Sequence, residues 1–294
     1  MSANMSEQKY LEACPLGCES ELFDSEILLP EGCLKVCSEC GQFFSQCSEK
    51  FFYESMEEFN VPQGTWPPPE NTQRLTRNTD KLLKKIEWIS AKKRDQIKLL
   101  DVGCSSGAFI NSAGLMGVEA EGVEPAREAS DAAVKAGLKV YNGFLSEVGL
   151  SSGSYDVITM FEVIEHVKDP VELLKECNRL LRDQGLLVVK TANSNSWTVA
   201  FQNGGWEYFS IKAHGGHISF FNKKSINVLA ERSGFRVVNY KTQSVTICDK
   251  EKSPYLVYRF FRIFSELMNL PAKILGRGQE MEVVLMKTGA DSRV

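Results

Sequence analysis

Apolar and polar positions along the chain follow two alternating periods, which predict a parallel sheet with helices on both faces. Apolar runs of strand length recur between segments whose apolar residues follow helical spacing. Strands that alternate with helices pair in parallel, because each helix returns the chain to the same edge of the sheet. The expected strands are 97–102, 119–123, 138–141, 155–160, 185–190, 235–240 and 281–287, and the expected helices are 72–93, 107–116, 126–136, 170–182 and 223–233.

The same pattern divides the chain into three parts. Residues 1–55 are rich in cysteine and poor in helical spacing, and the Pro-rich segment 56–71 is the expected linker. Residues 72–294 hold the alternating strands and helices, with 241–278 as an apolar helical insertion. The length of 294 residues suits one doubly wound α/β domain with seven mostly parallel strands and a small amino-terminal module.

The segment LLDVGCSSGAF (99–109) is the most informative motif. An apolar strand leads into Gly103, Ser105 and Gly107, so side-chain bulk is removed where the next helix begins. Such a turn lets backbone N–H groups approach a ligand closely. Glu124 ends the next strand, where a carboxylate could accept both hydroxyls of a ribose. These features predict a nucleoside cofactor, but the glycine spacing is not the G-x-G-x-x-G of dinucleotide enzymes.

Three further motifs follow this one in order. The set is LLDVGCSSGAF (99–109), GVEP (122–125), SYDVITMFEVIEHVKDP (154–170) and LLRDQGLLVVKTAN (180–193). On these motifs, residues 72–240 resemble the class I S-adenosylmethionine-dependent methyltransferases, nearest the ubiquinone-O-methyltransferase-like branch. The resemblance implies a Rossmann-like methyltransferase fold and S-adenosylmethionine as the cofactor.

The resemblance also implies which residues bind the cofactor. The loop would hold the methionine part, Glu124 the ribose, and Phe161 with Glu162 the methyl end. The family often places an Asp after the third strand against the adenine, whereas this chain has Phe144, which offers a backbone N–H and an apolar face. The full set is Asp101, Gly103, Cys104, Ser105, Gly107, Glu124, Phe144, Phe161 and Glu162.

The acceptor of a methyl group must be positioned and, if it is a hydroxyl, lose its proton. Two of the three histidines, His214 and His217, lie in segment 211–221, where the resemblance places acceptor-binding elements. His217 is the first candidate for a general base or acceptor hydrogen-bond partner and His214 the second; alternatively, His217 is a loop histidine that hydrogen-bonds the backbone. Glu165 and His166 occupy the family's common Glu-His position, where they either take part in the chemistry or cap and pack a short helix. The nearby aromatics, which could stack on an acceptor or form a lid core, are Trp197, Trp206, Tyr208 and Phe209.

Six of the nine cysteines lie within the first 47 residues, so the excess is local and indicates a metal rather than disulfides. Two close pairs, spaced C-x3-C and C-x2-C, approach the ribbon spacing in which two knuckles supply four thiolates to tetrahedral zinc. The first pair is one residue longer than usual, so Cys33 or Cys47 could replace Cys18. A structural zinc site is expected, with free thiols or a redox pair as alternatives. The expected ligands are Cys14, Cys18, Cys37 and Cys40.

The segment PYLVYRFFRIFSELMNL (254–270) is strongly apolar, with Arg259, Arg262 and Glu266 on a narrow arc of one helical face. The wide apolar face that remains has two interpretations. One is a helix buried over the sheet or at a dimer contact. The other is a surface for lipid or for a lipid-linked acceptor, since arginines beside a wide apolar arc suit an interfacial helix.

Together these patterns predict a methyltransferase that acts on an oxygen of a small-molecule or glycan acceptor, including a lipid-linked one. The net charge of −4 and the lack of a dense Lys/Arg stripe argue against a nucleic-acid partner. Two alternatives remain: an RNA methyltransferase with a zinc ribbon, and a non-catalytic cofactor-binding scaffold.

The chain has neither a signal-peptide-like start nor a run of about 18 uncharged apolar residues. We therefore expect a cytoplasmic protein whose membrane contact, if any, is peripheral and through 254–270.

Overall fold

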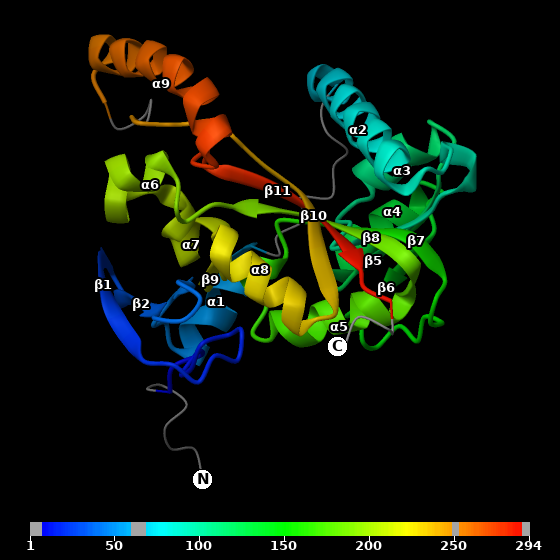
Figure 1. Cartoon of the computed structure of the whole chain (residues 1–294), viewed down its shortest axis with the longest axis horizontal. Helices are drawn as coiled ribbons and strands as arrows, with labels where there is room; N and C mark the ends of the chain where they lie inside the picture. Colours follow the sequence, from blue (N-terminus) through cyan, green and yellow to red (C-terminus); the bar gives the residue numbers. More distant parts are fainter. Residues whose placement is uncertain (1–7, 60–68, 249–252, 290–294) are drawn as a thin grey trace.

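A seven-stranded sheet forms the centre of the molecule in the computed structural model, which describes residues 8–59, 69–248 and 253–289 (Figure 1). The strand order is β10-β11-β8-β7-β4-β5-β6. The strands from β8 to β6 are parallel, while β11 pairs antiparallel with both β8 and β10. The strands are β4 (Lys98–Val102), β5 (Glu119–Glu124), β6 (Val140–Asn142), β7 (Tyr155–Phe161), β8 (Leu181–Ala192), β10 (Phe235–Gln243) and β11 (Glu280–Lys287).

Helices cover both faces of this sheet, which confirms the doubly wound α/β prediction. Adjacent residues Leu99 and Leu100 of β4 point to opposite faces, where they pack into two separate apolar clusters. Helices α2 and α3 contribute to the cluster around Leu99, and α5 and α8 to the cluster around Leu100. The helices are α2 (Pro69–Ser90), α3 (Ala108–Gly114), α4 (Arg127–Lys135), α5 (Pro170–Leu180) and α8 (Lys223–Arg232).

The amino-terminal segment shares a second, four-stranded sheet with the larger domain. Phe43 pairs with Phe220 across this sheet, and the backbone N–H of Ser45 donates to the carbonyl of Ile218 at 2.8 Å. A strand of two residues has no period that a sequence pattern could reveal, so this junction was not expected. The sheet consists of β1 (Leu22–Leu29), β2 (Gly32–Cys37), β3 (Phe43–Phe44) and β9 (Ser219–Phe220).

Helices occupy both ends of the segment expected as a linker, 56–71. Helix α1 (Glu49–Phe59) runs into its start, and α2 begins at Pro69; residues 60–68 lie outside the described residues. Proline suits the first turn of a helix, where its missing N–H would have no partner. The first residues of the expected linker therefore belong to α1 and its last residues to α2.

Helix α9 (Tyr255–Leu275) lies at the periphery of the molecule (Figure 1). Strand β10 continues to Gln243, so the apolar insertion begins three residues later than expected from the sequence. Only Ser265 and Ala272 of α9 are buried, so the interpretation of this segment as a helix buried over the sheet is wrong. In the described ranges, no helix is long and apolar enough to cross a membrane.

Candidate active site

Two glycines in the left-handed region shape the loop after β4. Gly103 has a φ of +74° and Gly107 a φ of +81°. A Cβ on Gly107 would lie 2.4 Å from Cδ1 of Leu138, and one on Gly103 would lie 2.5 Å from Cγ2 of Val163. Both positions therefore disfavour a side chain on conformational and on packing grounds. The result is an open backbone turn at the carboxyl end of β4, where ligands bind in doubly wound sheets.

Glu124 ends the neighbouring strand β5 and connects it to this loop. Its Oε2 accepts the backbone N–H of Ser105 at 2.8 Å, and its Oε1 accepts that of Ala126 at 2.8 Å. Ser105 has a φ of +48°, so the first bond stabilises an uncommon backbone conformation. Burial raises the pKa of Glu124. Each carboxylate oxygen keeps a second lone pair, so the two oxygens can still accept hydrogen bonds from the two hydroxyls of a ribose.

Asp101 is a buried carboxylate beside the same loop. The hydroxyl of Thr159 on β7 donates to its Oδ1 at 2.6 Å. Burial raises the pKa of Asp101 to about 7; the Thr159 bond lowers it, while the charge of Glu124 raises it further. An ionised Asp101 is thus poorly solvated, and a cationic group on a bound ligand would offset that cost.

The raised pKa of Asp101 leads to a prediction about stability. The folded protein holds this proton to a higher pH than the unfolded chain, so ionisation of Asp101 lowers folded stability as pH rises from about 4 to about 7. Asp101→Asn keeps an oxygen for Thr159 but cannot ionise. The ligand-free variant should therefore gain stability over wild type by up to about 1.4 kcal/mol per pH unit across that window, and no more above it. Thermal unfolding across pH measures this difference, and a difference that does not change with pH would contradict the assignment.

Two of the other expected cofactor residues also make contacts within the protein itself. The sulfur of Cys104 packs against Gly122, on which a Cβ would lie 2.4 Å away, and burial raises the pKa of this thiol. Cys104 is therefore a packing residue rather than a nucleophile. Phe144 is exposed, and its backbone N–H donates to Oε2 of Glu147 at 3.2 Å. The amide expected to face the adenine already has a partner within its own turn.

Phe161 and Glu162 lie at the carboxyl end of β7, next to β4. The ammonium of Lys190 lies 4.5 Å from the ring centroid of Phe161, and the ring of Phe109 packs edge-on at 5.0 Å. Glu162 has a φ of +53°, which turns the chain out of the strand. Both residues therefore lie at the same edge of the sheet as the glycine loop.

Tyr208 connects a cluster of polar side chains beyond β7 and β8, of which Glu165 and Thr191 are buried. Its hydroxyl hydrogen-bonds to Glu165, lies 3.1 Å from Oε2 of Glu162 and lies 3.2 Å from the hydroxyl of Thr191. Glu165 is fully buried, and burial together with the charge of Glu162 raises its pKa well above the usual range. The sequence indicated Tyr208 only as an aromatic residue and did not indicate Thr191, because neither contact is local in the chain.

All three histidines gather around this cluster. The ring centroid of His217 lies 4.1 Å from that of Tyr208, 4.6 Å from that of His166 and 4.9 Å from that of His214. Nδ1 of His217 is 2.9 Å from the carbonyl oxygen of Tyr208, so this nitrogen carries the ring proton and Nε2 keeps a lone pair. Burial lowers the pKa of His217 to about 2 and that of His166 to about 4. Both rings are therefore neutral near pH 7.

Two groups of side chains in the described ranges have ligand atoms close enough to share a metal ion. One group joins Glu165, His166 and His217, whose ligand atoms lie within 4.8 Å of one another. Glu165 already accepts hydrogen bonds from Tyr208 and from Thr191, the latter at 3.1 Å. Its carboxylate is thus satisfied without a cation. The second group consists of four cysteines.

Residues 72–240 match a family model described as a methyltransferase domain. The chain belongs to this methyltransferase family. It is a class I S-adenosylmethionine-dependent methyltransferase, and the fold described above agrees with that assignment. The non-catalytic scaffold considered from the sequence is therefore not supported.

Among its relatives, the methyltransferase is similar to the ubiquinone biosynthesis O-methyltransferase of Bordetella bronchiseptica, with 27% identity over 191 residues, which cover 61% of this chain and 78% of the relative. The enzyme of the same name from a Caulobacter species is 33% identical over 119 residues, which cover 38% of this chain and 47% of that protein.

Solved structures show the same fold. Phosphoethanolamine N-methyltransferase 2 of Haemonchus contortus in complex with S-adenosyl-L-methionine gives a TM-score of 0.54 at 15% identity, covering 84% of this chain and 62% of that one. A methyltransferase from Archaeoglobus fulgidus gives a TM-score of 0.50 at 18% identity, covering 72% and 94%.

The residues of the loop fit S-adenosylmethionine, which supplies a sulfonium methyl group to an acceptor. The Glu124 carboxylate suits the ribose hydroxyls, and the buried Asp101 suits a positively charged ligand. The methyltransferase thus provides an anionic, largely pre-formed cradle at the carboxyl ends of β4 and β5.

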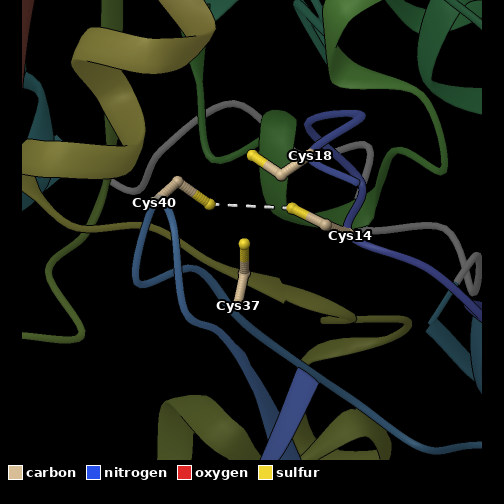
Figure 2. Close-up of side chains that lie close together, drawn as sticks. All are labelled: Cys14, Cys18, Cys37 and Cys40. Carbon is tan, nitrogen blue, oxygen red and sulfur yellow. Dashed lines mark hydrogen bonds between the residues drawn. The ribbon is translucent and has the colours of Figure 1, made fainter. Parts of the chain in front are cut away.

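The four sulfurs of Cys14, Cys18, Cys37 and Cys40 point toward a common centre (Figure 2). All lie within 4.8 Å of one another, and those of Cys14 and Cys40 are 3.6 Å apart. Tetrahedral zinc with Zn–S bonds of about 2.3 Å separates its sulfurs by about 3.8 Å, so the cluster has the size of a zinc site. Cys33 and Cys47 are not in the cluster.

Two glycine turns explain how the unequal cysteine pairs converge. The N–H of Gly17 donates to the carbonyl of Cys14, and the N–H of Gly41 donates to the carbonyl of Cys37, each at 2.8 Å. Both glycines adopt positive φ values, +74° and +69°. The first turn accommodates the extra residue before Cys18, so a C-x3-C pair reaches the same centre as a C-x2-C pair.

The cysteine cluster of the methyltransferase is joined to the histidine segment by short connections. Asn222, which caps α8, donates its side-chain N–H to the carbonyl of Gly41 at 2.6 Å. Arg232 at the other end of α8 pairs with Glu39 at 3.1 Å. Strand β3 follows Gly41 and pairs with β9, whose first residue lies two positions after His217. The turn that carries Cys37 and Cys40 therefore supports the backbone that carries His217.

Proposed function

We propose that the methyltransferase transfers its methyl group to a hydroxyl oxygen of a small-molecule or glycan acceptor, including one carried on a lipid. The observation that carries this proposal is the position of His217 beside Tyr208, with Nδ1 against a carbonyl oxygen so that Nε2 keeps a lone pair. An imidazole lone pair suits a hydroxyl hydrogen. The O-methyltransferase names of the sequence relatives favour oxygen over nitrogen.

His217 acts in this proposal as a hydrogen-bond partner for the acceptor. Its proton is held at Nδ1 by the carbonyl of Tyr208, which leaves Nε2 as the acceptor atom. With a pKa near 2, the imidazole is a weak base. At pH 7 it therefore orients the acceptor hydroxyl through a hydrogen bond and does not take up its proton fully. His214 is the second candidate, and Glu165 holds Tyr208 in place.

This role gives a prediction for His217. His217→Ala should lower turnover by about tenfold or more, the value of one lost hydrogen bond of about 1.5 kcal/mol, while binding of S-adenosylmethionine stays within about twofold. His217→Gln should recover most of the loss, because its amide can donate to Tyr208 and accept from the substrate. Release of S-adenosylhomocysteine measures turnover and calorimetry measures binding. Equal turnover in the wild type and in the Ala variant would remove His217 from the site.

For the cysteine cluster we propose one structural zinc ion, bound by Cys14, Cys18, Cys37 and Cys40. The sulfur spacing supports it, as does the small size of the amino-terminal sheet, which needs a staple to be stable. Cysteines can bind zinc only while they stay reduced, so we also propose that the protein works in the cytoplasm.

An acceptor screen with methyl-labelled S-adenosylmethionine tests the proposed reaction. Phenols, catechols, sugar nucleotides and lipid-linked sugars form one arm, amines a second and RNA a third. Label on a hydroxyl acceptor supports the proposal, whereas label confined to amines overturns it. Label on RNA together with salt-dependent RNA retention would instead identify the RNA methyltransferase alternative.

A further inference from the structure

Helix α9 carries a stripe of large apolar side chains that the rest of the described chain leaves exposed. At 100° per residue the stripe spans an arc of about 80°, because its members recur at intervals of four and three residues. Each member is between 58% and 78% exposed. They are Leu256, Phe260, Ile263, Leu267, Leu270 and Ile274.

The opposite face of α9 holds the helix on the body of the protein. Ser265 accepts the backbone N–H of Ile247 at 3.3 Å, and Asn269 accepts that of Val245 at 2.7 Å. Ala272 is fully buried on the same face. The stripe consequently points away from the protein. Helix α9 itself lies at the outer edge of the molecule in Figure 1.

A charged flank borders the stripe on one side. It consists of Arg259, Arg262, Glu266 and Lys273. Arg262 and Glu266 form an ion pair at 3.4 Å, so the flank as a whole is positive. Apolar residues continue around the other side of the stripe through Val257 and Phe264, both exposed. This combination of a wide apolar arc and basic edge residues is typical of helices that lie in a membrane interface.

We propose that α9 binds the surface of a bilayer containing anionic lipids, with the stripe inserted below the headgroups and Arg259 and Lys273 against lipid phosphates. A second copy of the chain fits the stripe less well. Antiparallel pairing over its full length would set Glu266 against Glu266 of the partner subunit, and Arg259 near Lys273 of the partner subunit. Like charges at such a contact are repulsive.

The position of α9 connects this surface with the acceptor side of the site. Asn193, two residues beyond Thr191, donates its side-chain N–H to the carbonyl of Gly278 at 2.8 Å. The N–H of Trp197 donates to the carbonyl of Arg277 at 2.9 Å. The turn after α9 is thus bonded to the segment after β8. Membrane binding itself does not depend on the proposed acceptor, so it can be measured without turnover.

Vesicle co-sedimentation of the full chain tests the proposal. Vesicles of phosphatidylcholine alone are compared with vesicles that also contain phosphatidylglycerol. The wild type should bind the anionic vesicles, and Ile263→Glu/Leu267→Glu should lower its affinity for them about tenfold or more. Arg259→Gln/Lys273→Gln should weaken binding to the anionic vesicles only. The matched control is Leu115→Glu, which replaces a still more exposed leucine at the end of α3 and should bind as the wild type does.

Binding of S-adenosylmethionine and thermal unfolding confirm that each variant is folded. The proposal is overturned if the wild type binds neither kind of vesicle. It is also overturned if Ile263→Glu/Leu267→Glu and Leu115→Glu lose affinity for anionic vesicles to the same extent. A dimer seen by light scattering that Ile263→Glu/Leu267→Glu disperses, without vesicle binding, also overturns it and assigns the stripe to a second copy.

Discussion

Cys40→Ser is expected to purify without zinc and to lose methyl transfer while it still binds S-adenosylmethionine. Cys40 is fully buried in the four-sulfur cluster, and a serine hydroxyl is a far weaker ligand for zinc than a thiolate. Structural zinc contributes about 10–16 kcal/mol to the folding of small zinc modules, so loss of the ion should unfold the amino-terminal sheet and lower the melting temperature on the order of 10 °C.

Loss of zinc should also lower turnover, because β3 holds the segment that carries His217. The N–H of Ser45 donates to Ile218, and Phe43 pairs with Phe220. The cofactor loop has no such dependence on the knuckle, since Glu124 is held by amides of its own domain. Affinity for S-adenosylmethionine should therefore stay within about threefold of wild type, whereas acceptor turnover falls to background.

Cys33→Ser is the matched control for this experiment. Cys33 lies in β2 of the same sheet, is only partly buried and is not in the cluster. The Cys33 variant should retain one zinc per chain by mass spectrometry of metals, together with wild-type melting and turnover. Full zinc content in Cys40→Ser, or a wild-type protein purified under reducing conditions without zinc, would contradict the metal assignment.

The sequence predicted the middle of the central sheet well, because strands there contain apolar residues that are buried by helices on both faces. Leu186 to Val189 of β8 is such a run, and parallel strands covered on both sides have this pattern. The ends of the strands were harder to predict. Strand β8 extends from Leu181 to Ala192, beyond the apolar core 185–190, because backbone pairing with its neighbours continues where the side chains become polar.

The junction of the two sheets could not be predicted in the same way. Phe43 and Phe220 pair across 177 positions of sequence through strands of two residues each. No periodic signal exists over so short a stretch, and only the packing of the whole molecule brings the strands together. A separate module was the natural expectation from composition alone.

The cofactor site could be predicted from the sequence more completely than the acceptor side, for a similar reason. Gly103, Ser105 and Gly107 are local in the chain, and their small side chains mark the turn in the sequence itself. The contacts of Tyr208 with Glu165 and Thr191 join three separate segments, and no local pattern in the sequence indicates that these residues meet. Sequence patterns therefore locate the donor site more completely than the acceptor side.

Glu124→Gln is expected to weaken S-adenosylmethionine binding about a hundredfold. Both carboxylate oxygens accept backbone N–H groups at 2.8 Å, from Ser105 and from Ala126, whereas glutamine has only one oxygen. One amide of the loop would face an NH₂ group, and one ribose hydroxyl would lose its acceptor. Hydrogen bonds to a charged group contribute about 1.5–3 kcal/mol each, so a total near 3 kcal/mol corresponds to this loss of affinity.

Glu119→Gln provides the control, because Glu119 begins the same strand and is exposed. Among the described residues its carboxylate forms an ion pair only with Lys98, at 3.1 Å. Its affinity for S-adenosylmethionine should stay within about twofold of wild type. Glu124→Asp adds a second comparison: it keeps the charge but is one methylene shorter, so it cannot reach both amides and should bind with intermediate affinity. Calorimetry measures all three variants. If Glu124→Gln bound as tightly as the control, the carboxylate would be needed only to shape the loop, and the ribose would have to be held by other groups.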